Sequence, residues 1–148
     1  MIIGVDLDNT IICYDQLFKK VAYSLHLLPK SFYGDKNKIR DFIISKKNGV
    51  NNWKKIQGLV YGKYMKNAKL MNNFLNFLLL CEQKNHKLFI VSHKTKYGHF
   101  DKEKIELRKE SLKWIKRNIV LKKNFINFNK NNIFFANTRK EKVKIISN

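Results

Sequence analysis

The stretch IIGVDLDNTII, residues 2–12, decides which fold this sequence can form. Its first half is apolar and rich in β-branched residues, which is typical of a short buried strand in a parallel sheet. Two acids, Asp6 and Asp8, follow at once, although the chain of 148 residues has only 11 acids and a formal net charge of +20. Ligands bind at the carboxyl ends of parallel strands, so these acids predict a functional site there.

Two later apolar runs predict further strands, HKLFIVS at residues 86–92 and NIFFAN at residues 132–137. Stretches with helical spacing of apolar residues lie between the predicted strands, at residues 14–28, 68–84 and 101–118. The alternation of strands and helices predicts an α/β fold with a parallel sheet.

Residues that start and stop helices refine these predicted boundaries. Pro29 is expected to end the first helix, and Asp101 is expected to cap the N-terminus of the third. Thr138 and Glu141 have the spacing of a capping box, so a last helix is expected to begin there.

The first and second predicted strands are too far apart for a single crossover. Thr10 and Ser92 are 82 positions apart, whereas a βαβ unit needs about 30 residues, so about fifty residues are expected to be inserted. We therefore expect a core domain at residues 1–13 and 69–148 and a helical insertion at residues 14–68. Residues 30–67 are the least regular part of the sequence.

The composition limits the classes of protein that fit. The chain has 27 lysines and only four arginines, a bias that we interpret mainly as drift toward A/T-rich codons, although the charge predicts nonspecific attraction to polyanions. No apolar run reaches the length of a membrane span, and the two cysteines, Cys13 and Cys81, make no disulfide framework. With no basic leader at the N-terminus, a cytoplasmic location is the expectation.

The residue types at the strand ends suit phosphoryl transfer. One carboxylate can attack phosphorus, and a second, two residues further on, can exchange a proton with the leaving-group oxygen and then with water. A hydroxyl such as that of Ser92 and a lysine can hold the phosphoryl oxygens, while Mg²⁺ offsets repulsion between the carboxylates and the phosphate.

Three motifs resemble those of the haloacid dehalogenase superfamily of phosphohydrolases. DLDNT at residues 6–10 is similar to its first motif, DxDxT; LFIVSH at residues 88–93 resembles its second, and TRKEKVKII at residues 138–146 resembles the region of its third. The resemblance implies a Rossmann-like core, with helices on both faces of the sheet, and a small helical cap inserted after the first motif.

The resemblance also implies roles for single residues. Asp6 would be the nucleophile and Asp8 the general acid and base, and Mg²⁺ would be bound by Asp6 and the backbone carbonyl of Asp8. Thr10 would support the loop and Ser92 would bind the phosphoryl group. The expected activity is Mg²⁺-dependent hydrolysis of a small phosphate monoester through an aspartyl-phosphate intermediate.

Lysines are harder to assign from the sequence. Lys142 would be the lysine of the third motif, with Lys140 as the alternative. Lys94 follows Ser92 in a basic loop and is the residue of that loop that we favour for substrate binding.

One motif of the family is missing from the sequence. The fourth motif ends in acids that complete the metal site, but after Glu110 the only acid is Glu141. Asp101 is a candidate substitute ligand. Two alternative hypotheses follow: a truncated, catalytically impaired protein or half of a split enzyme, and a nucleic-acid-binding or polynucleotide-end phosphatase module suggested by the charge.

The missing motif also has a structural consequence. Its strand would pair beside the first strand, so residues 1–7 are expected to form a bare apolar edge, which can recruit another strand. We expect self-association or binding of a partner fragment there. Light scattering tests this, because a clean monomer at high concentration would contradict it.

Overall fold

A three-stranded parallel sheet forms the centre of the α/β fold in the computed structural model, which describes residues 1–121 and 130–147. The strand order is β1 (Ile2–Val5), β4 (Lys87–His93) and β5 (Ile133–Ala136), and these are the three predicted strands. Val5 lies opposite Ile90, so β1 and β4 end at the same edge of the sheet.

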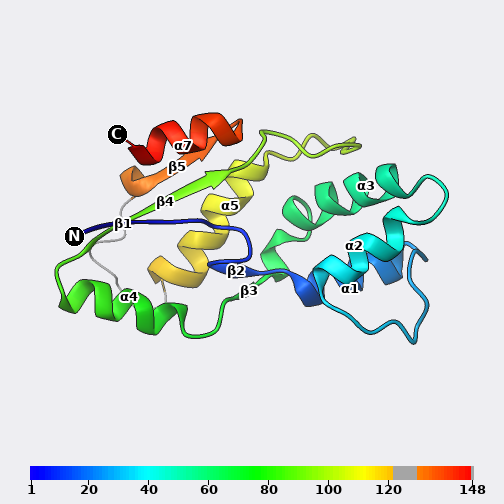
Figure 1. Ribbon diagram of the computed structural model, residues 1–148, viewed down its shortest axis with the longest axis horizontal. Helices are drawn as coiled ribbons and strands as arrows, with labels where there is room; N and C mark the ends of the chain where they lie inside the picture. Colours follow the sequence, from blue (N-terminus) through cyan, green and yellow to red (C-terminus); the bar gives the residue numbers. More distant parts are fainter. Residues whose placement is uncertain (122–129, 148) are drawn as a thin grey trace.

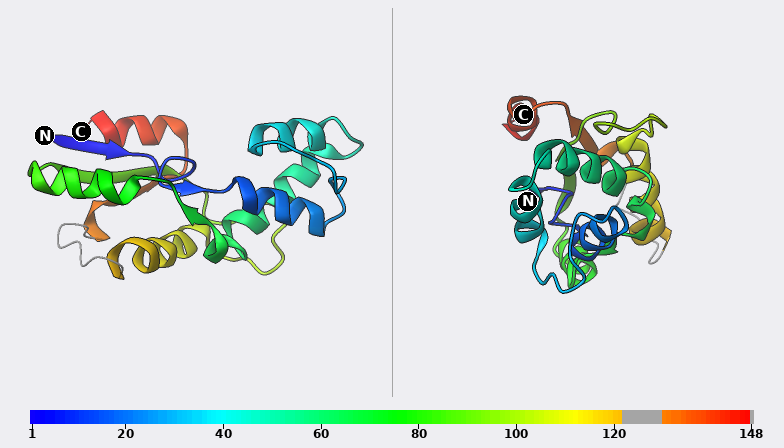
Figure 2. Two further views of the ribbon diagram at one scale, coloured as in Figure 1. Left: turned by 90° about the horizontal axis from the view of Figure 1, so that it is seen from below. Right: turned by 90° about the vertical axis from the view of Figure 1, so that its right-hand side faces the viewer.

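Helices lie on both sides of this sheet. The helix α4 (Phe74–Gln83) packs against β4, and α7 (Arg139–Ser147) packs against β4 and β5. On the side of the sheet opposite α7 lies α5 (Leu107–Ile115), which continues into the π-helical turn η2 (Lys116–Val120) (Figures 1 and 2). A short 3-10 turn, η3 (Lys130–Asn132), precedes β5.

The first part of the segment between β1 and β4 forms a helical lobe at one end of the molecule, away from both termini (Figure 1). Its elements are α1 (Asp15–Ser24), α2 (Lys36–Ile44), α3 (Gly49–Tyr61) and the 3-10 turn η1 (Met65–Asn67). The chain enters through β2 (Ile12–Cys13) and returns through β3 (Lys69–Leu70), which pair antiparallel. This pairing closes the base of the lobe, so both ends of the inserted segment are fixed close to Asp8.

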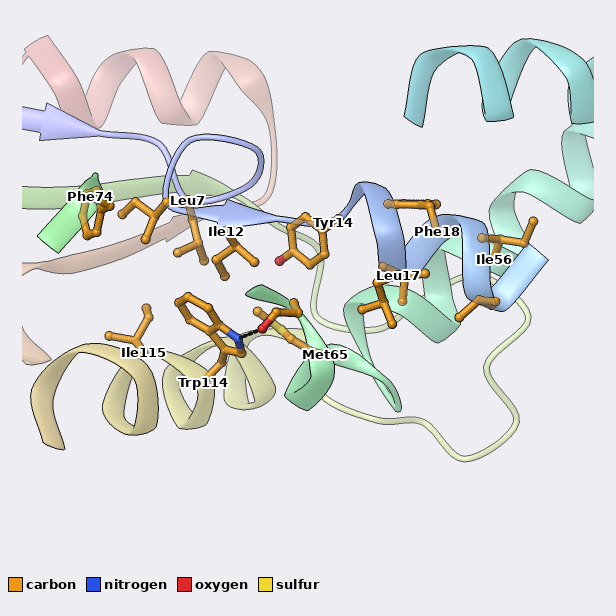
Figure 3. Packing of buried hydrophobic residues seen from close by; sticks show 14 of the residues in the cluster. Leu7, Ile12, Tyr14, Leu17, Phe18, Ile56, Met65, Phe74, Trp114 and Ile115 are labelled. Carbon is orange, nitrogen blue, oxygen red and sulfur yellow. Dashed lines mark hydrogen bonds between the residues drawn. The ribbon is translucent and has the colours of Figure 1, made fainter. Parts of the chain in front are cut away.

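One hydrophobic core runs from the sheet into the lobe. Figure 3 shows Leu7 and Ile12 packed with Trp114 near the sheet, and Phe18 within the lobe. The helix α5 and its continuation η2 also hold the returning segment by polar contacts: the indole N–H of Trp114 donates to the Ala68 carbonyl (2.9 Å) and Arg117 donates to the Lys66 carbonyl (2.6 Å). The junction of lobe and sheet is therefore fixed by α5.

The predicted helix at residues 68–84 is wrong in its first third. Residues 69–70 form β3, and α4 begins only at Phe74, after Asn73 in the left-handed conformation (φ 62°). Pairing with β2 and the hydrogen bond from Trp114 to Ala68 hold this segment extended. Tertiary contacts thus override a pattern that favours a helix.

The other two predicted helices have different ends from those expected. The third begins at Leu107 instead of Asp101, because the Asp101 carboxylate accepts hydrogen bonds from the amides of Glu103 and Ile105 and forms a turn of its own. The first helix ends at Ser24, and His26 adopts a left-handed conformation (φ 56°), so the helix stops before Pro29.

The strand β1 is an edge of the sheet, as expected. Among the strands of the described residues it pairs with β4 alone, and Met1 and Ile2 are 76% and 72% exposed. None of the helices in residues 1–121 and 130–147 is long and apolar enough to cross a bilayer.

Candidate functional site

The two aspartates and Ser92 lie at the carboxyl edge of the sheet. Asp6 directly follows β1, and Ser92 is the penultimate residue of β4. A tight turn follows, in which the Leu7 carbonyl accepts hydrogen bonds from two amides further along the chain, at residues 11 and 12. The turn brings Asp8 back toward β2, and Asn9 at its tip is left-handed (φ 60°).

Asp6 is paired with a lysine from the far end of the chain. The Lys142 ammonium donates to Asp6 Oδ1 at 2.6 Å, across 136 positions of sequence. The helix that carries Lys142, α7, is capped as predicted. The Thr138 hydroxyl accepts a hydrogen bond from the Glu141 amide (3.1 Å), and the Glu141 carboxylate accepts one from an amide before the helix. Of the two candidate lysines, the structure therefore brings Lys142 to the aspartate, whereas Lys140 is exposed.

Asp8 accepts two hydrogen bonds on one oxygen. The Lys94 ammonium donates to its Oδ1 at 2.9 Å, and the Tyr14 hydroxyl donates to the same atom at 2.7 Å. Both donors are buried. Burial, reinforced by the neighbouring Asp8 carboxylate, raises the pKa of Tyr14 well above its usual value, so the phenol remains a donor.

Ser92 and Thr10 differ in their surroundings. The Ser92 hydroxyl is buried, and within the described part of the chain it has no hydrogen-bond partner. An unpaired buried hydroxyl is costly unless a ligand or water completes it. Thr10 is exposed in the turn and makes no side-chain hydrogen bond to the residues that the structure describes. Its predicted role in supporting the loop is therefore not supported by a side-chain hydrogen bond.

Three residues that the sequence did not identify complete the surroundings of Asp8. They are Tyr14, Tyr61 on α3 and Lys36 on α2. The Lys94 ammonium lies 4.8 Å from the Tyr61 ring centroid, and the Lys36 ammonium donates to the Tyr61 hydroxyl at 3.0 Å. Burial lowers the pKa of Lys36 and raises that of Tyr61. Tyr61 of the helical lobe therefore contacts Lys94, and Lys94 in turn contacts Asp8.

Arg108 was also missed, and it fixes the backbone beside the site. Its guanidinium donates to the Lys94 carbonyl (2.9 Å) and to the Asn137 side chain (2.6 Å), and so links the loops after β4 and β5. A signal was present in the sequence, because arginine is scarce among 27 lysines. Only a planar fork makes two such directed bonds, which explains arginine at this position.

A pocket of about 280 Å³ opens beside Asp8, between the helical lobe and the loop after β4. From α3 it is lined by Lys54, Gln57 and Tyr61, and from the loop by Lys94 and His99 among others. Neither Asp6 nor Lys142 lines it, so it lies on the Asp8 side of the carboxylate pair.

Two glycines allow α3 to approach the loop that closely. A Cβ atom added to Gly98 would lie 2.6 Å from the Cα atom of Gly58, and one added to Gly58 would lie 2.8 Å from the His99 carbonyl oxygen. Contacts of this length with backbone cannot be relieved by turning a side chain. This crossing of backbones forms one wall of the pocket.

The substitution Gly98→Ala is therefore expected to push α3 from the loop and to lower the free energy of unfolding by about 1–3 kcal/mol, the usual cost of overpacking. Urea denaturation would measure it. Gly4→Ala is the matched control, because an added Cβ there meets nothing within 4 Å and is expected to be neutral. Equal stability of the two variants would contradict the described crossing.

A metal site built only from side chains is not present in the described segments, since no group of three His, Cys, Asp or Glu residues is close enough to bind an ion. The Asp101 carboxylate, the candidate substitute ligand, bonds to amides of its own turn and lines a different hollow. Two oxygens from residues two positions apart remain free of hydrogen bonds from described residues, Asp6 Oδ2 and the Asp8 backbone carbonyl.

Comparison of the chain with protein-family models, with curated proteins and with solved structures finds no match.

Proposed function

We propose that the chain is a hydrolase of small phosphate monoesters in which Asp6 is transiently phosphorylated, as its resemblance to the haloacid dehalogenase superfamily implies. The observation that carries the proposal is the pairing of each aspartate with a lysine distant in sequence, Asp6 with Lys142 and Asp8 with Lys94. Acids and cations brought together at the end of parallel strands suit a phosphate group better than a purely structural role.

The chain's own residues account for the proton and bond changes. Asp6 Oδ2 attacks phosphorus while the bond from phosphorus to the leaving-group oxygen breaks, and the protonated form of Asp8 donates its proton to that oxygen and becomes a carboxylate. Asp8 then takes a proton from water, whose oxygen attacks phosphorus and displaces Asp6. Lys142 and the Ser92 hydroxyl hold the phosphoryl oxygens.

Asp8 is oriented for this exchange. Lys94 and Tyr14 both occupy its Oδ1, and its Oδ2 accepts no hydrogen bond from residues that the structure describes. The second oxygen is thus available to the leaving group and then to water.

The oxygens near Asp6 fit a weakly bound Mg²⁺. This ion needs few protein ligands when waters and substrate phosphate oxygens complete its shell. The Asp6 oxygen that does not attack phosphorus and the Asp8 backbone carbonyl could provide them, and when bound the ion would offset the charge of the phosphate.

Trapping of the phosphorylated chain tests the proposal. Hydrolysis of p-nitrophenyl phosphate with Mg²⁺ would be quenched in acid, and the tryptic peptide ending at Lys19 would be sequenced by mass spectrometry. We expect hydroxylamine-sensitive phosphate on Asp6. Absence of hydrolysis, or hydrolysis without phosphate on Asp6, would contradict the proposal.

A milder change tests the orientation of Asp8. Tyr14→Phe keeps the buried ring but removes the bond to Asp8, and hydrogen bonds to charged groups are worth about 1.5–3 kcal/mol, so kcat is expected to fall about tenfold with little change in KM. Tyr23→Phe is the control, because its hydroxyl bonds backbone carbonyls at residues 30 and 32, away from Asp8. If both variants reduce kcat alike, the effect is structural.

A further inference from the structure

The pocket beside Asp8 identifies the side on which a leaving group would lie. This step rests on the proposed function, in which Asp8 protonates the leaving-group oxygen. Asp8 lines the pocket, whereas Asp6, Ser92 and Lys142 do not. A substrate with its phosphorus at Asp6 would therefore place its leaving group in the space between α3 and the loop after β4.

The walls of this space carry unbalanced positive charge. The charge of Asp8 is matched by Lys94, with which it forms an ion pair. Lys54, half-buried on α3, makes no ion pair with an acid in the described part of the chain, and no other acid lines the pocket. Gln57 and His99 add hydrogen-bonding groups to the walls of the pocket.

From these walls we infer that the substrate is an acidic phosphate monoester, whose leaving group carries a second anionic group bound by Lys54. A lysine that lines the pocket and has no ion pair in the described part of the chain is well placed to bind an anion that arrives with the ligand. At about 280 Å³ the pocket lies at the small end of the range for ligand sites, which favours a leaving group of a few carbons over a nucleoside.

Two phosphate esters of similar size separate this inference from its alternatives. The leaving group of 3-phosphoglycerate has a carboxylate where that of glycerol 1-phosphate has a hydroxymethyl group. The wild-type chain is expected to hydrolyse the acidic ester with a kcat/KM about tenfold higher than that of the neutral one. Lys54→Gln is expected to remove this preference.

The neighbouring lysine offers a matched control. Lys55 is exposed and lines a separate hollow that does not contain Asp8. The variant Lys55→Gln makes the same change of net charge and is expected to keep the preference for the acidic ester. If the two variants reduce the preference equally, long-range attraction explains it and the Lys54 site is refuted.

A binding measurement distinguishes failure of this site from failure of the proposed chemistry. Calorimetric titration of the Asp6→Asn variant with the same esters needs no turnover. Tighter binding of 3-phosphoglycerate, lost when Lys54→Gln is added, would support the anion site even if no hydrolysis occurs. Equal affinity for the two esters, or no binding of either, would overturn it. Loss of hydrolysis alone bears only on the role of Asp6.

Discussion

The variant Asp6→Asn is expected to hydrolyse p-nitrophenyl phosphate at least about 10³-fold more slowly than the wild-type chain, since removal of a nucleophile costs factors of this order or larger. An amide oxygen is a poor nucleophile and forms no acyl phosphate. The side chain keeps its size, so Lys142 retains an acceptor nearby. Steady-state kinetics with Mg²⁺ measures the effect.

An acid outside the site controls for general changes of charge. Asp41 is exposed on α2 and pairs only loosely with its neighbour Arg40 (3.6 Å), so Asp41→Asn is expected to leave kcat unchanged. Equal rates for the Asp6→Asn variant and the wild type would remove the catalytic proposal. Urea denaturation of the same samples would show whether a loss of rate reflects unfolding.

Replacing Trp114 by alanine is expected to lower the free energy of unfolding by about 3–5 kcal/mol, the usual cost of removing a buried aromatic side chain. Trp114 is 1% exposed and packs where the sheet meets the helical lobe (Figure 3). It also satisfies the Ala68 carbonyl. The variant loses both the packing and the bond that holds the returning segment.

A second variant separates these two contributions. Trp114→Phe keeps much of the buried ring but leaves the Ala68 carbonyl unpaired, which is expected to cost about 1–3 kcal/mol. Leu80→Ala is the control, because Leu80 is 53% exposed on α4 and the change is expected to stay within about 0.5 kcal/mol. Midpoints of urea denaturation would rank the three, and a Trp114→Ala variant as stable as the Leu80→Ala control would contradict the described core.

Much of the site could be predicted because it follows from local rules. Asp6, Asp8 and Ser92 were found from their positions after apolar runs, since strands in a parallel sheet end at a common edge. The choice between Lys140 and Lys142 could not be made that way. It depends on the direction from which α7 approaches Asp6, and the packing of that helix against β4 and β5 sets this direction.

The roles of Tyr14 and Tyr61 could not be predicted from the local sequence pattern. Tyr14 lies next to the start of a helix, and Tyr61 reads as one more apolar residue of α3, because the partners of both hydroxyls come from other segments. The same reason explains the incorrect helix start at residue 68, where the pairing of β3 with β2 outweighs a helical pattern.

The sequence by itself determined the three strands, the helical segment between the first two and the pair of aspartates, because alternation of apolar runs and the residues that follow them are local properties. Only the tertiary structure decided which lysines meet those aspartates, and that α3 forms a pocket with Lys54 beside Asp8. These contacts join residues as far apart as 136 positions, and the packing of helices on a sheet, not the order of residues, brings them together.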